Sequence, residues 1–409
     1  MTSEHNDHMN VNGRTMKACL VTLAVFLSLV AATAVRAQSR EVIGYYPSWK
    51  WTSRNNLVTP ARIPYDKLTI INYAFFVPHP DGWIVGKDSV GDALYLKDNL
   101  DPVTGARIPG TSLTALAHTH GVKVMLSLGG WEDSDNFPAV AAGAETRARF
   151  AHSCIERIRE YGFDGIDIDW EYPGYEGHKG TPQDRENFTL LLRTLKDSLV
   201  AHGKHTGSTF LLTAAVPAGM ATASGIDMVR VADILDMVNI MTYDFHGPWD
   251  RLANHNAPLY SSEGTDSARC IDGALKLYHR TFGIPASKIN LGVPFYGQTF
   301  ASCATLNSPH TGADTTHFST HGAFYYDIVG IMDHFTRSWD DRAKVPYLVS
   351  KEWNMLISYD DEESVGQKAQ YVLENKARGL IIWEITGDFM PDGTTPLLDV
   401  IHNRFSTAK

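Results

Sequence analysis

The sequence predicts an α/β protein whose core is a (β/α)8 TIM barrel, a closed ring of parallel strands surrounded by helices. The first observation is that eight short β-rich stretches recur along the 409-residue chain. The second is that each stretch is apolar almost throughout, as a strand is when both of its faces are covered. The third is that segments of helical periodicity separate most of these stretches, and this alternation is typical of the barrel.

The predicted strands occupy, in order, residues 41–47, 68–76, 121–130, 163–172, 209–217, 236–244, 288–297 and 379–385. Between them, the segments 144–162 and 185–203 have apolar residues at spacings of three and four, which indicates amphipathic helices. A doubly wound open sheet is the competing topology. No GxGxxG pattern follows the first strand, and this removes the usual dinucleotide-binding form of that alternative.

The stretch between Gly297 and Gly379 is longer than one connecting helix needs. Within it, the segments 322–330 and 344–361 have the pattern of antiparallel strands with short turns. The segment 361–377 then has the pattern of the helix that precedes the eighth strand. We therefore predict a small α+β insertion after the seventh strand, at residues 298–355.

Residues 1–37 have the features of an export signal. Basic residues precede the apolar run 19–30, and small residues follow it up to Ala37. A membrane anchor is the alternative, because the run approaches spanning length. The small residues favour cleavage, so we expect a secreted or periplasmic barrel domain at 38–409, with no membrane attachment after cleavage.

The composition, 44% hydrophobic and 20% charged, is that of a soluble globular protein. The formal net charge of -10 and the lack of a long basic run argue against a nucleic-acid partner. Cys154, Cys270 and Cys303 remain after cleavage, so at most one disulfide can form. The pair Cys270 and Cys303 is possible, but the sequence does not establish it.

Three carboxylates alternate along the fourth predicted strand, in FDGIDIDWEYP at 163–173. Alternate side chains of a strand share one face, so Asp167, Asp169 and Glu171 point the same way. The isoleucines between them suit the helix-covered face, and we therefore predict that the acids point into the barrel. Glu171 comes last, at the carboxyl end of the strand, where barrel active sites lie. Asp164 has the opposite parity and is predicted to hold the turn into the strand.

Three acids in a closed interior cannot all ionise cheaply, so some of their pKa values should rise. A Glu kept protonated near neutral pH is what a general acid requires. A solvent-facing edge strand is one alternative, but the neighbouring strands have no wet face. A Ca²⁺ or Mg²⁺ site is another, and no Asn or Gly-turn loop supports it. We expect no metal and no cofactor, and we interpret His118, His120, His202 and His205 as solvated surface.

The stretch DGIDIDWEYP resembles the DxxDxDxE motif of family 18 glycoside hydrolases, the chitinases. Further stretches resemble other strands of that family, and the similarity runs from Val42 to Asp388: these are SLGGW (127–131), MTYDFHGPWD (241–250), NAPLY (256–260), GVPFYG (292–297) and IIWEITGD (381–388).

The resemblance implies a role for each matching carboxylate. Glu171 matches the general acid, and Asp169 matches the residue that bonds the substrate's acetamido group and then Glu171. Asp167 matches the buried charge partner of Asp169. Tyr243 and Asp244 match the groups that hold the acetamido carbonyl and nitrogen.

Further matches imply the substrate-binding positions: Tyr45, Trp49, Trp131, Met241, Trp249, Tyr296 and Trp383. Trp383 matches the aromatic floor beneath the sugar that is cleaved. We expect Trp170, on the opposite face of its strand, to be a core residue. One position departs from the family, because Gln298 stands where Arg is usual, and this puts in doubt the affinity for sugars on the minus side.

The resemblance implies a monomeric secreted chitinase that acts on chitin or chitooligosaccharides. It would hydrolyse β-1,4-linked N-acetylglucosamine polymers by retaining catalysis, with the substrate's own acetamido oxygen as the nucleophile. An endo-β-N-acetylglucosaminidase acting on N-glycans is the alternative enzyme. A chitin-binding lectin on the same barrel is an alternative of another class, and such proteins lack the acid that Glu171 supplies.

Overall fold

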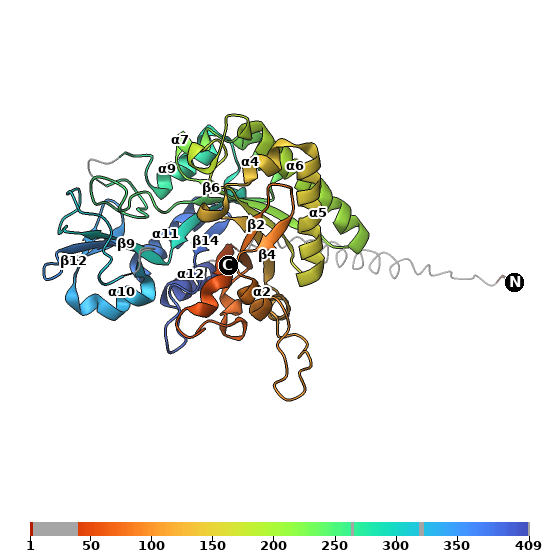
Figure 1. Ribbon diagram of the computed structural model, residues 1–409, viewed down its shortest axis with the longest axis horizontal. Helices are drawn as coiled ribbons and strands as arrows, with labels where there is room; N and C mark the ends of the chain where they lie inside the picture. The colour runs from red at the N-terminus through yellow and green to blue at the C-terminus, as the bar shows by residue number, and fades with distance from the viewer. Residues whose placement is uncertain (3–39, 263–265, 319–322, 408–409) are drawn as a thin grey trace. The chain divides into compact units, whose positions relative to one another are not determined.

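The computed structural model describes residues 1–2, 40–262, 266–318 and 323–407, so the predicted export signal lies almost wholly outside the described residues. Eight parallel strands pair in the order β1, β14, β8, β7, β6, β5, β4, β2, and β2 pairs again with β1. The ring is therefore closed, and the predicted barrel is confirmed (Figure 1). Its strands are β1 (Glu41–Pro47), β2 (Ile70–Pro78), β4 (Lys123–Gly129), β5 (Gly165–Asp169), β6 (Leu211–Pro217), β7 (Met237–Met241), β8 (Ile289–Pro294) and β14 (Gly379–Trp383).

Several strands end earlier than predicted, and β5, β7 and β8 each do so by three residues. β5 ends at Asp169 and β7 ends at Met241, whereas the apolar patterns continue to Tyr172 and Asp244. Glu171 and Tyr243 consequently lie in the loops that follow the strands, at the carboxyl end of the barrel.

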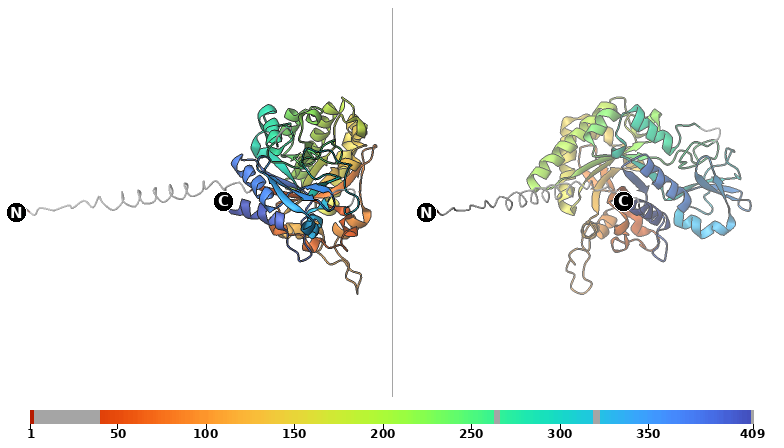
Figure 2. Two further views of the ribbon diagram at one scale, coloured as in Figure 1. Left: turned by 90° about the vertical axis from the view of Figure 1, so that its left-hand side faces the viewer. Right: turned by 180° about the vertical axis from the view of Figure 1, so that it is seen from behind.

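Helices cover the outside of the ring (Figure 2). They are α3 (Leu113–Thr119), α5 (Ala144–Tyr161), α6 (Asp184–Thr206), α8 (Met228–Ile234), α9 (Ile271–Lys276), α11 (Glu362–Glu374) and α12 (Pro396–Thr407). Shorter elements are α2 (Ser89–Tyr95), α4 (Phe137–Ala142), α7 (Met220–Ala223), β3 (Ile84–Gly86), η4 (Trp131–Asp133), η5 (Glu176–His178), the π turn η6 (Leu277–Thr281) and η7 (Ala286–Lys288). Within the described residues, no helix has the length and apolar character needed to cross a membrane.

The connection between β1 and β2 differs from the others. The described chain there forms only three 3-10 turns, η1 (Ser48–Thr52), η2 (Pro60–Arg62) and η3 (Tyr65–Lys67). Each remaining connection between neighbouring parallel strands contains at least one α-helix. η1 follows the carboxyl end of β1 directly and so belongs to the rim where the candidate site lies.

A second, antiparallel sheet of five strands lies beside the barrel, in blue tones in Figures 1 and 2. Its order is β10 (Ala323–Phe324), β9 (Tyr296–Ala301), β13 (Met355–Ser358), β12 (Val345–Ser350) and β11 (Thr336–Asp340). β12 and β13 form the hairpin expected from the sequence. The strand expected at 322–330 is instead the short β10 followed by α10 (Tyr325–Ile331) and η8 (Met332–His334). Short apolar runs fit either period, which explains the error.

Buried apolar side chains form two main layers. The larger lies between the strands and the helices and includes Ile166, Ile168 and Trp170. The smaller fills the barrel and includes Tyr45 and Met241. The outward direction of the two isoleucines and of Trp170 is thereby confirmed.

The three described cysteines are buried and free. Cys270 Sγ accepts a hydrogen bond from the backbone N–H of Gly273, and Cys303 Sγ donates to the carbonyl of Thr305. The possible pairing of Cys270 with Cys303 is therefore absent from the structure.

Candidate active site

Asp167 lies in the middle of β5 and is fully buried inside the barrel. Its Oδ2 accepts hydrogen bonds from Tyr45 Oη and Ser127 Oγ, both at 2.9 Å. Its Oδ1 accepts from Thr213 Oγ1 at 2.5 Å and from Asn239 Nδ2 at 3.2 Å. Burial raises the pKa of Asp167, and these hydrogen bonds oppose the rise. Both carboxylate oxygens are thus fixed by donors from four other barrel strands, β1, β4, β6 and β7.

Asp169 differs from Asp167 because one of its buried oxygens, Oδ1, has no hydrogen-bond partner among the described residues. Burial raises the pKa of Asp169 well above its ordinary value, and the charges of Glu171 and Asp167 raise it further. This carboxyl is therefore poised to share a proton or to accept a hydrogen bond from a ligand.

Glu171 is half-buried, two residues beyond the end of β5. Burial raises its pKa to about 7, a hydrogen bond from Tyr172 opposes the rise, and the charge of Asp244 adds to it. Its backbone N–H donates to Ser134 Oγ at 2.9 Å, which ties the loop to the chain after β4. A carboxyl group that is still protonated near neutral pH can deliver a proton to a leaving oxygen.

Asp244 lies in the loop after β7 and is exposed. Its backbone adopts a left-handed conformation with φ of 55°, and its N–H donates to Asn256 Oδ1 at 2.8 Å. Its Oδ1 accepts hydrogen bonds from Tyr296 Oη and Gln298 Nε2, both at 2.8 Å. Gln298 thus makes a neutral contact to a site carboxylate from β9 of the second sheet.

Aromatic side chains gather near the carboxyl end of the barrel, and one of them, Tyr45, donates a hydrogen bond to Asp167. Trp383 ends β14, stacks on Phe75 with ring centroids 5.7 Å apart, and lies 5.5 Å from the ring of Tyr45. Trp49, in η1, packs 6.1 Å from the same Phe75 ring. Tyr243 meets Tyr296 edge to face at 6.3 Å, and Met241 is buried in the barrel core next to it.

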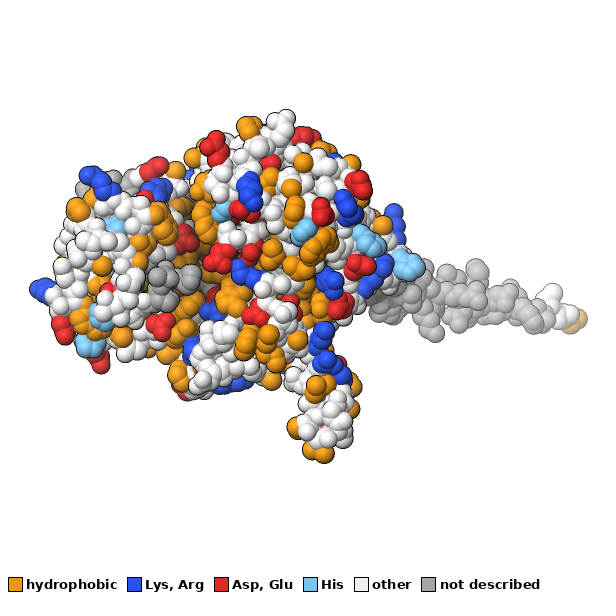
Figure 3. Space-filling model, viewed as in Figure 1, with side chains coloured by type: hydrophobic (Ala, Val, Ile, Leu, Met, Phe, Trp, Pro, Cys, Tyr) orange, Lys and Arg blue, Asp and Glu red, His pale blue; other side chains and the backbone are white. Residues whose placement is uncertain are grey.

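Two tryptophans lie further out on the rim. Trp131 is 52% exposed and packs against Tyr172, Tyr175 and His178 at 6.5, 5.7 and 4.7 Å. Trp249 is 61% exposed. Figure 3 shows a hollow between the barrel and the part of the molecule that carries the second sheet, walled by hydrophobic and acidic side chains.

The sequence analysis did not identify the donors around Asp167. Ser127, Thr213 and Asn239 are single polar residues inside otherwise apolar strands, at positions that face the barrel interior. That pattern is the signal that could have revealed them, because a buried polar side chain requires a partner.

The interpretation of His202 as solvated surface is wrong, because His202 is 7% exposed and its ring packs on Phe210 with the centroids 4.9 Å apart. His118, His120 and His205 are exposed, as expected.

His118 Nε2 pairs with Asp164 Oδ2 at 2.8 Å, and the same oxygen accepts the backbone N–H of Val124 at 2.7 Å. This hydrogen bond raises the pKa of His118. Asp164 holds the entry of the strand, as its parity predicts.

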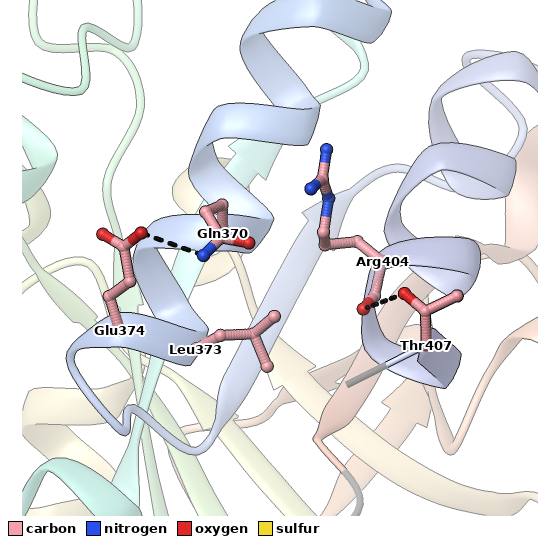
Figure 4. A pocket seen from close by; sticks show the side chains of 5 residues that line it. All are labelled: Gln370, Leu373, Glu374, Arg404 and Thr407. Atoms are coloured by element: carbon pink, nitrogen blue, oxygen red, sulfur yellow. Dashed lines mark hydrogen bonds between the residues drawn. The ribbon is translucent and has the colours of Figure 1, made fainter. Parts of the chain in front are cut away.

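A separate surface hollow lies between α11 and α12 (Figure 4). It is lined by Gln370, Leu373, Glu374, Arg404 and Thr407 and contains no predicted site residue. The described residues include no group of three or more His, Cys, Asp or Glu side chains arranged to hold a metal ion.

Comparison with known proteins shows similarity over most of the described chain, including the candidate site. The family model described as "Glycosyl hydrolases family 18" matches residues 41–388. The chain is 36% identical to "Chitinase A1" of Niallia circulans over 88% of its own length, and it spans 58% of that protein. It is 33% identical to "Endochitinase 1" of Metarhizium robertsii, over 84% of this chain and 80% of that one.

A solved structure has the same fold. Catalytic domain 2 of the Ostrinia furnacalis Group II chitinase, crystallised as a mutant in complex with (NAG)5, is similar with a TM-score of 0.80 and 28% identity. The similarity covers 90% of this chain and 97% of that domain.

Proposed function

The chain belongs to glycosyl hydrolases family 18, and from that premise we propose that it is a chitinase. It would hydrolyse β-1,4-linked N-acetylglucosamine polymers with retention of configuration. Glu171 is the general acid in this proposal, and Asp169, Asp167, Tyr243 and Asp244 support it.

The observation that carries the proposal is the contrast between neighbouring carboxyl groups. Glu171 has its pKa raised to about 7, so it retains a proton at the pH where a general acid works. Asp169, two residues before Glu171, offers a buried oxygen without a partner among the described residues. Asp167 is held by four donors, which supports a role as the fixed partner beneath them.

The nucleophile in this proposal comes from the substrate. Retaining glycosidases of the common type place a second carboxylate across the sugar from the acid, and family 18 is a known exception. Asp167 and Asp169 belong to β5, and Glu171 follows the end of that strand by two residues. All three carboxyl groups therefore come from one short segment, and in this proposal neither aspartate lies across the sugar from the acid. The 2-acetamido oxygen would attack as an intramolecular nucleophile, oriented by Asp169 and Tyr243, and form an oxazolinium ion.

The aromatic side chains support a polymeric amino sugar as the substrate. Flat rings pack well on the apolar faces of pyranoses, and Trp49, Trp131, Trp249 and Trp383 are each at least partly exposed. The Ostrinia relative was crystallised with (NAG)5, which supports the same substrate class. A lectin function would require no acid, and the poised carboxyl of Glu171 argues against it.

The mechanism is tested by the configuration of the first product. NMR of early products from chitooligosaccharides should show the β-anomer, and fully deacetylated chitosan should be inert. An α-anomer as first product, or glucosamine at the new reducing ends of partly acetylated chitosan, would refute the substrate-assisted mechanism.

The substrate class is tested in parallel by offering an N-glycopeptide under the same conditions. Release of chitooligosaccharide fragments with an intact glycopeptide supports the chitinase. Cleavage within the glycopeptide core, with chitooligosaccharides untouched, would instead identify an endo-β-N-acetylglucosaminidase.

We also propose that residues 1–37 direct export and that the mature chain acts as a monomer without a metal or cofactor. The basic, apolar and small residues in order support the first point. N-terminal sequencing of the exported protein should begin at Gln38, and light scattering should give the mass of one chain. A retained leader would favour a membrane anchor.

A further inference from the structure

A buried ion pair lies just beyond the carboxyl ends of β1 and β14. Lys50 Nζ is 2.6 Å from Glu384 Oε1, and the two side chains are 8% and 1% exposed. Lys50 belongs to η1, which follows β1, and Glu384 follows the end of β14. These two strands are neighbours in the barrel, so the pair joins two adjacent segments of the rim.

The partners of the pair fix its position. Glu384 Oε2 accepts the backbone N–H of Thr386 at 2.8 Å, and Glu384 Oε1 accepts Thr386 Oγ1 at 2.8 Å. The ammonium group of Lys50 lies 3.7 Å from the centre of the Phe324 ring, in β10 of the second sheet. The Glu384 carboxylate is therefore paired with Lys50 and Thr386, and the Lys50 ammonium group also contacts the Phe324 ring of β10.

Each residue of the ion pair is adjacent in sequence to a tryptophan that the proposed function assigns to sugar binding. Lys50 directly follows Trp49, and Glu384 directly follows Trp383. Both indoles pack on the same ring, Phe75, at 6.1 and 5.7 Å. The ion pair thus joins the two segments that carry the tryptophans, and Phe75 contacts both indole rings.

We propose that Lys50 and Glu384 are positioning residues that set the spacing between Trp49 and Trp383, and so favour substrates long enough to contact both rings. This inference rests on the proposed function, because it takes both rings as sugar-binding surfaces. A buried ion pair is weak evidence for stability, since well-packed apolar residues often replace one without loss. We therefore assign the ion pair a role in positioning. Two sugar units of one oligosaccharide can stack on both tryptophan rings only if the rings are held at a fixed separation.

The test compares chain lengths. The double variant K50M/E384Q removes both charges at nearly constant volume and avoids leaving one charge buried alone. Its kcat/KM for the N-acetylglucosamine hexamer should fall about ten-fold, whereas kcat/KM for the trimer should change less than about two-fold, because only long substrates contact both rings. Lys50→Arg keeps the positive charge. The ratio of its kcat/KM for the hexamer to its kcat/KM for the trimer should stay close to the wild-type ratio.

The matched control is the other buried ion pair, Lys368 with Asp360, whose side chains are each 1% exposed and lie on and before α11. K368M/D360N should lower the melting temperature without changing the hexamer-to-trimer ratio. The same comparison can be made on binding alone, without turnover. Calorimetry would measure the affinities for hexamer and trimer of Glu171→Gln and of Glu171→Gln combined with K50M/E384Q.

The outcomes separate the two proposals. An unchanged ratio in folded K50M/E384Q, or an equal loss in the control, would overturn the positioning role while leaving the chitinase proposal intact. A wild-type chain that neither binds nor cleaves any N-acetylglucosamine oligomer would overturn both. If K50M/E384Q does not fold, the neutral variant K50Q/E384Q, which again leaves no charge buried alone, should show the same selective loss for the hexamer.

Discussion

In the proposed mechanism, Glu171, Asp169 and Asp167 have different roles because their carboxyl groups lie in different surroundings. Asp167 has both oxygens bound, Asp169 has one oxygen without a partner among the described residues, and Glu171 reaches the cleft. Environment rather than residue type therefore assigns the roles.

Replacing Glu171 with Gln should reduce kcat by about 10² to 10⁴-fold, because only proton donation is lost. Substrate binding, measured by calorimetry, should change little. Asp169→Asn should also be severe. Near-normal turnover by a folded Glu171→Gln chain would show that the acid lies elsewhere.

The pH dependence follows from the raised pKa of Glu171. Its protonated form is the active acid, so kcat/KM should decline as the pH rises above about 7. The charge of Asp244 contributes to this rise, so Asp244→Asn should lower the pKa of Glu171 and move the alkaline limb to lower pH by about half a unit or more. A limb that stays in place, or moves to higher pH, would contradict the electrostatic coupling.

At the scale of elements, the pair formed by His118 and Asp164 links the end of α3 to the entry of β5. The folded pKa of His118 is raised, so the stability that it contributes is present in full below about pH 6.5 and is lost as the pH rises through the folded value. His118→Gln should therefore lower the unfolding free energy more at about pH 5.5 than at about pH 9. The difference between the two losses should not exceed about 1 kcal/mol, because the pair is partly exposed. Denaturant melts at both pH values measure the difference, and an equal cost at both would exclude a charged pair.

Strand β9 carries the contact that departs from the family pattern. Gln298→Arg would place a cation beside Asp244, which adds attraction between opposite charges to the hydrogen bond that the neutral amide already donates. Binding of long chitooligosaccharides should tighten by about two- to ten-fold. Gln298→Leu, which removes the donor, should weaken binding, and equal affinities for all three chains would show that the contact is irrelevant to substrate.

The sequence was sufficient to predict the eight barrel strands, because a strand covered on both faces is apolar throughout. It was not sufficient to predict where β5 and β7 end, since the apolar pattern continues into the loops that carry Glu171 and Tyr243. Nor could it predict the contact between Gln298 and Asp244. That contact depends on the left-handed backbone of Asp244, which a non-glycine residue rarely adopts.

At the scale of the whole molecule, two tryptophans show how position separates binding from stability. Trp170 is 1% exposed and stacks on Phe137 at 5.2 Å, whereas Trp249 is 61% exposed. Trp170→Ala should cost about 3–5 kcal/mol of unfolding free energy. Trp249→Ala should leave the melting temperature nearly unchanged and weaken binding of long oligosaccharides, and a large fall in that temperature would make Trp249 a core residue instead.

Closure of the barrel joins the two ends of the folded chain. β14 pairs with β1 on one side and β8 on the other, and Arg378 bonds Glu41, 337 positions earlier in the sequence. A ribosome that adds about 5–20 residues per second needs roughly 20–70 s to make that span, so β1 emerges long before its last neighbour exists. Throughout that interval the edges of β1 and β8 that β14 will cover are unpaired, and the ring is open. If residues 1–37 direct export as proposed, this delay leaves the barrel unclosed, and the chain able to pass through a translocation channel, until nearly all of it has been synthesised.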